Sequence, residues 1–182
     1  MRSGTIQNIP MSSTVRDRPL DPRQALLEAY ATNERINQYM LENLDDAAWH
    51  AEPPGGKGRT IAAIVAHMHN VRHMWLVAAK AKSLPDKLDR GTVTRREAME
   101  ALSKSAESCR EVLAEALAHP EGRVRGFRPE VVGLFAYLLS HDAHHRGQVC
   151  ALARQLGHAL PKAATFGMWE WGSRWKECGF GE

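Results

Sequence analysis

The feature that most constrains the fold is a spacing of apolar residues every three or four positions, repeated in four segments. This spacing places the apolar side chains on one face of a helix, and no alternating pattern long enough for a sheet occurs. The expected helices cover about 22–43, 61–80, 95–118 and 131–156. Four amphipathic helices joined by loops of roughly 10–15 residues predict an all-α chain, an antiparallel four-helix bundle.

Capping signals support these boundaries. Pro22 occupies the first position of the first helix, and Thr94 with Glu97 forms a capping box at the start of the third. Gly157 ends the fourth helix. The segment 52–58 is rich in proline and glycine and is expected as a loop.

The 182 residues are enough for one domain to bury a core without disulfides or a structural metal. We expect residues 1–20, which lack periodicity, to form a mobile N-terminal arm. Residues 21–182 are expected to form a single domain ending in a tryptophan-rich tail without regular structure. The sequence does not decide whether translation starts at Met1 or Met11.

Charge and cysteine content exclude several classes of protein. The net charge is only +3 and the basic residues are scattered, which argues against nucleic acid as a partner. No apolar run approaches the roughly 20 residues that span a bilayer, and no secretory leader is evident. Three widely spaced cysteines are typical of reduced thiols, so we expect a cytoplasmic protein without membrane partners.

Histidines concentrate on two of the expected helices. On the last helix the inward stripe is apolar at both ends and polar in the middle, where it holds His141, His145 and Gln148. Burying imidazole and amide groups is costly unless each finds a partner. His141 and His145 lie one turn apart and can bind a single metal ion. The alternative is that the two histidines satisfy each other and the backbone.

A third ligand has to come from another helix. Two candidates lie on different flanks of the second helix, either His67 alone or the pair His69 and His73. Helical geometry leaves both open and favours His67, because His73 lies furthest from the apolar centre of that helix.

The most specific motif is the segment 141–148, which reads HDAHHRGQ. It resembles the HxxHHRGQ signature of the DinB/YfiT-like superfamily, bacterial four-helix bundles often described as metalloenzymes. Segments 66–75 and 165–171 resemble two further recurring segments of these proteins. The resemblance covers the four helices and the tail, and it leaves out the N-terminal arm.

This resemblance implies a ligand set. Its pattern has one histidine on the second helix and two on the last, which correspond here to His67, His141 and His145. It therefore selects His67 over the alternative pair. The superfamily commonly has Glu where this chain has Asp142, which argues against Asp142 as a general base.

Three neutral imidazoles leave a coordination position open, as catalytic metal sites do. We expect one divalent ion, zinc or nickel, with iron or manganese as alternatives. The open position suits a metal-bound water that acts as a nucleophile or a substrate thiol held as thiolate. The resemblance implies both, since relatives include transferases acting on mycothiol or bacillithiol and metal-dependent hydrolases.

Thiol transfer to or from a small molecule is the favoured prediction. A hydrolase usually needs a base near the metal-bound water, and Asp142 lies about 100° around the helix from His141, off the face that carries the ligands. A metal-dependent hydrolase is the first alternative. A non-enzymatic bundle that binds metal or forms a homodimer through exposed apolar faces is the second. No catalytic residue is assigned.

Four further polar residues are candidates for substrate binding or for orienting a ligand. Arg146 and Gln148 lie beside the histidines, and Asn33 and Asn37 face inward on the first helix. The plainer interpretations are an ion pair for Arg146 and a hydrogen bond between the two asparagines. We expect the tryptophans of the tail to cover the bundle or a dimer face.

Overall fold

The computed structural model describes residues 19–180. This part of the chain contains helices and no strand, which confirms the prediction of an all-α chain. The helices are α1 (Pro22–Glu42), α2 (Ile61–Ala79), α3 (Arg95–Ala118), α4 (Val131–Gln155), α5 (Lys162–Gly167) and α6 (Trp171–Glu177). Most of the expected N-terminal arm, residues 1–18, lies outside the described residues.

The four long helices begin and end close to the predicted positions because their caps form as expected. The Asp21 carboxylate accepts hydrogen bonds from the backbone at the start of α1. Thr94 and Glu97 form the complete capping box of α3. After α4 the chain turns at Gly157, whose φ of 84° favours glycine.

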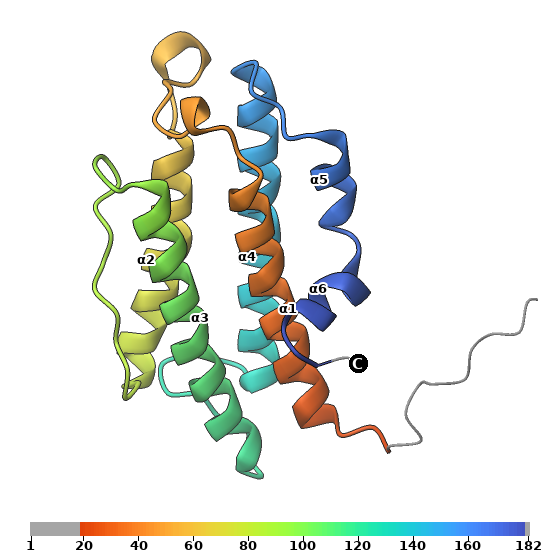
Figure 1. Cartoon of the computed structure of the whole chain (residues 1–182). Helices are drawn as coiled ribbons and strands as arrows, with labels where there is room; N and C mark the ends of the chain where they lie inside the picture. The colour runs from red at the N-terminus through yellow and green to blue at the C-terminus, as the bar shows by residue number, and fades with distance from the viewer. Residues whose placement is uncertain (1–18, 181–182) are drawn as a thin grey trace, which may run out of the picture.

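The directions of the helices follow from one long connection. Figure 1 shows residues 80–94 returning along the bundle, so that α2 and α3 run in the same direction. Among the pairs in contact, α1 with α3 and α2 with α4 are antiparallel, whereas α2 with α3 and α1 with α4 are parallel. The parallel pairs depart from the predicted antiparallel arrangement, because the connection 80–94 is long enough to return the chain to the end of the bundle where α2 begins. Within the described residues no helix is long and apolar enough to cross a membrane.

The core consists of two apolar clusters with a buried polar layer between them. One cluster includes Met40, Val65 and Val149, and the other includes Leu76 and Leu138. Polar side chains of α1, α2 and α4 are buried between the two clusters. They include Asn33, Glu34, Asn37, Arg72 and Asp142.

The tail departs from the prediction, because it forms the short helices α5 and α6, which pack on α1. Gly167 lies against the ring of Tyr39, and the guanidinium of Arg174 stacks over the same ring, 3.9 Å from its centroid. Trp175 donates a hydrogen bond from Nε1 to Glu28. Trp175 therefore covers the bundle as expected, whereas Trp169 is 78% exposed. Helices this short carry too few turns to show an apolar period.

Candidate metal centre

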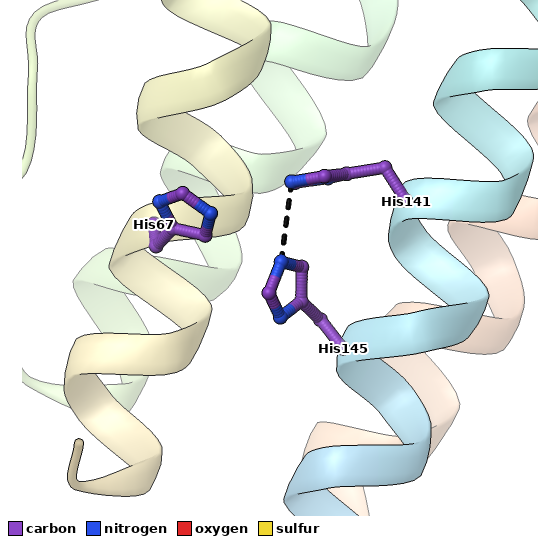
Figure 2. Close-up of side chains that lie close together, drawn as sticks. All are labelled: His67, His141 and His145. Atoms are coloured by element: carbon purple, nitrogen blue, oxygen red, sulfur yellow. Dashed lines mark hydrogen bonds between the residues drawn. The ribbon is translucent and has the colours of Figure 1, made fainter. Parts of the chain in front are cut away.

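Three histidines from two helices converge in the bundle. His67 comes from α2, and His141 and His145 come from α4 (Figure 2). One nitrogen of each ring lies within 4.8 Å of the others. The ring centroid of His67 lies 5.3 Å from the ring centroid of His141 and 4.8 Å from that of His145. The three candidate ligands are thus brought together.

The spacing of the two α4 nitrogens suits a metal ion. Nε2 of His141 and Nε2 of His145 are 3.2 Å apart. In a tetrahedral zinc site, metal–nitrogen bonds of about 2.0–2.1 Å place two ligand nitrogens about 3.4 Å apart. Nδ1 of His67 is buried without a hydrogen-bond partner among the described residues. The donor set of imidazole nitrogens fits zinc, nickel, iron or manganese.

The electrostatics keep these rings neutral at pH 7. Burial, followed by repulsion from His145, lowers the pKa of His67 to about 4. Burial and the same neighbour lower the pKa of His141 to about 4, and burial lowers the pKa of His145. Neutral imidazole is the form that binds metal.

Gln148 orients His145. Its Oε1 accepts a hydrogen bond from Nδ1 of His145 at 2.8 Å, which leaves the electron pair of His145 on Nε2, facing His141. Its Nε2 donates to His144 at 3.0 Å. Gln148 is exposed, so it lies outside the buried stripe of α4 in which the sequence analysis placed it.

The alternative pair on α2 does not join this cluster. Nε2 of His69 lies 2.7 Å from the carbonyl oxygen of Asp86, and Nδ1 of His73 lies 2.8 Å from that of Pro85. Both histidines thus contact the connection 80–94. This connection covers their flank of α2, so that His69 is fully buried and His73 is half-buried.

Comparison with protein families matches the model of the DinB family over residues 11–176. The chain belongs to the DinB family. The match begins inside the expected N-terminal arm. No curated protein and no solved structure matches the chain. Membership in the DinB family and the three-histidine cluster together fit a metal-binding protein.

In this DinB-family protein, Arg146 and the two asparagines belong to the polar layer. Nη1 of Arg146 donates to Oδ1 of Asn33 at 2.8 Å and to Oδ1 of Asn37 at 2.7 Å. Both asparagines donate from Nδ2 to Oδ2 of Asp142. The plainer interpretations, an ion pair for Arg146 and a hydrogen bond between the asparagines, are therefore both wrong. These residues join α1 to α4 behind the histidines.

Sequence reasoning missed two members of this layer. Nη2 of Arg72 lies 2.7 Å from Oδ2 of Asp142 and 2.7 Å from Oε2 of Glu34. Arg72 is fully buried, in line with Met68 and Leu76 on α2. The sequence did contain a signal, a charged residue within an apolar stripe. It could have indicated acidic partners on other helices, because a buried guanidinium requires them.

A groove opens beside His145 in this DinB-family protein, and we call it the His145 groove. It has a volume of about 540 Å³. It is lined by Arg59, Ile64, His144, His145, Gln148, Ala151, Leu152 and Gln155. The histidine cluster is therefore next to a space of the size that binds small molecules.

Proposed function

We propose that this DinB-family protein binds one divalent ion, zinc or nickel, through His67, His141 and His145 and transfers a low-molecular-weight thiol to an electrophilic small molecule. One observation carries the proposal: three neutral imidazoles converge beside an open groove. Three protein ligands are typical of catalytic sites, since closed structural sites use four.

The reaction would form one bond and break another. A divalent ion bound here would keep the substrate thiol ionised at neutral pH. The sulfur then forms a bond to an electrophilic carbon of the second substrate. The bond from that carbon to its leaving group breaks, the leaving group takes the electron pair, and the thiol proton goes to solvent.

The surroundings of the histidines support thiol transfer over hydrolysis. A hydrolase needs a base close to the attacking water. Asp142 is 1% exposed and its Oδ2 accepts hydrogen bonds from Arg72 and the two asparagines of α1, so it is not available as this base. Besides His145, the only ionisable side chains among the described residues of the groove lining are those of Arg59 and His144. Hydrolysis would therefore depend on His144.

The test begins with metal content. We would measure metals in the tag-free full-length protein, in His145→Ala and in His69→Ala, a matched loss of a buried histidine outside the cluster. We expect about one ion per chain in the wild type and in His69→Ala, and none in His145→Ala. A wild type that takes up no zinc or nickel would contradict the proposal and favour histidines that only satisfy each other.

Activity is measured next on the metal-loaded protein. Conjugation of small thiols to a chlorinated dinitrobenzene reports transfer, and ester cleavage without thiol reports hydrolysis. We expect conjugation in the wild type and its loss in His145→Ala. Ester cleavage that disappears in His144→Ala would instead support the hydrolase.

A further inference from the structure

The His145 groove is unusual in the charge of its lining. Among the described residues that line it, the polar side chains include a guanidinium and two amides, and none is a carboxylate. Its apolar wall consists of Ile64, Ala151 and Leu152. A groove with cationic and amide donors and without acidic groups repels cations and attracts anions.

Arg59 is the cation of this groove. It is exposed, and among the described residues its side chain has neither a hydrogen bond nor an ion pair. Gln155, on the last turn of α4, also has no side-chain hydrogen bond within the described part of the chain. Two donors thus line the groove without a partner.

We propose that the His145 groove binds a carboxylate of the substrate through Arg59, with Gln155 as a second donor. This inference rests on the proposed function, and it narrows the substrate to a thiol that also carries a carboxylate. The carboxylate lies in the groove while the sulfur of the same molecule reaches the position shared by the three histidines.

A carboxylate fits better than a phosphate. One guanidinium presents two parallel N–H groups, which match the two oxygens of a carboxylate. Arg59 is the only lysine or arginine among the described residues of the lining, whereas phosphate sites gather several donors from backbone amides or further cations. The volume of about 540 Å³ is large enough for a small thiol acid.

The experiment compares two thiols of equal length. The full-length protein is loaded with Co²⁺ and titrated with 3-mercaptopropionate or with 3-mercaptopropan-1-ol, which replaces the carboxylate by a neutral alcohol. Sulfur-to-cobalt charge-transfer absorption reports binding of the sulfur independently of turnover. We expect the wild type to bind the thiol acid about tenfold more tightly, as a charged hydrogen bond allows.

Two arginine variants then separate contact from general charge. Arg59→Gln should remove the preference for the thiol acid. Arg125→Gln makes the same change in net charge at an exposed position on the connection between α3 and α4, at the opposite end of the bundle (Figure 1). It should keep the preference.

The outcomes distinguish the two proposals. Equal affinities for both thiols in the wild type, or a preference that survives in Arg59→Gln, would overturn the carboxylate site and leave thiol binding intact. If Arg125→Gln loses the preference for the thiol acid as Arg59→Gln does, the preference comes from the net charge of the protein, and this result would also overturn the carboxylate site. No charge-transfer band with either thiol would contradict the proposed function itself.

Discussion

Arg72 on α2 and Asp142 on α4 form an ion pair inside the bundle, with Nη2 and Oδ2 2.7 Å apart and both side chains at most 1% exposed. Arg72 shares its helix with His67, and Asp142 directly follows His141. The pair therefore ties together the two helices that supply the candidate ligands. Buried ion pairs add little net stability, but losing one partner leaves a costly unpaired charge.

This relationship predicts a large effect of Arg72→Met. The substitution leaves Asp142 and Glu34 without their shared cation, so we expect the free energy of unfolding to fall by about 3–5 kcal/mol. Urea denaturation measures the change. Arg96→Met is the control, because its ion pair with Glu100 is exposed and its loss should cost less than about 1 kcal/mol. If both variants lose a similar amount of free energy of unfolding, the buried ion pair matters no more for stability than the exposed one.

The hydrogen bond from His145 to Gln148 predicts a graded effect on metal affinity. Gln148→Leu removes the acceptor that fixes the ring, and we expect zinc to bind about 10- to 100-fold more weakly. Gln148→Glu keeps an acceptor at the same place and should bind zinc at least as tightly as the wild type. Competition with a zinc-binding dye measures both constants. If Leu and Glu have equal effects, Gln148 does not act through His145.

The long helices and part of the site were predictable because their signals are local. An apolar period and a capping box, such as Thr94 with Glu97, each span only a few residues. The pair His141 and His145 was predictable for the same reason, because the two residues are one helical turn apart. The third histidine could not be predicted from local signals, since helical geometry alone left two flanks of α2 open. The connection 80–94 decides between them, because it covers the flank of His69.

The polar layer escaped prediction because its partners are distant in sequence. The contacts of Arg72 reach across 38 residues to Glu34 and across 70 to Asp142. An apolar period shows which face of a helix is buried, but it does not show which polar residues meet inside. The single-sequence interpretation of Asn33 and Asn37 failed in the same way, since their partner is Asp142 on α4.

Cys109, in the apolar cluster that includes Leu76 and Leu138, offers a test of the core that needs no metal. Burial raises the pKa of its thiol to about 11, so at pH 8 only about one molecule in a thousand carries the reactive thiolate. A raised pKa favours the neutral thiol. Below the pKa, the thiolate fraction grows about tenfold for each unit of pH, so labelling of Cys109 should speed up as the pH rises. We expect a disulfide reagent at pH 8 to label the half-buried Cys178 in the native protein and Cys109 only in urea. Peptide mass spectrometry identifies the labelled site, and equal labelling rates would contradict the burial of Cys109.

The contact of α5 with α1 predicts opposite effects of the same substitution at two glycines. A methyl group at Gly167 would lie 2.5 Å from the hydroxyl of Tyr39, whose ring is held on another side by Arg174. We expect Gly167→Ala to lower the free energy of unfolding by about 1–3 kcal/mol, as overpacking does. At Gly172 in α6 nothing lies within 4 Å of the added methyl, so Gly172→Ala should raise stability by about 0.5–1 kcal/mol through helix propensity. Thermal unfolding of both variants measures the two signs. If Gly167→Ala also stabilises the protein, the C-terminal helices are not packed on α1 as described.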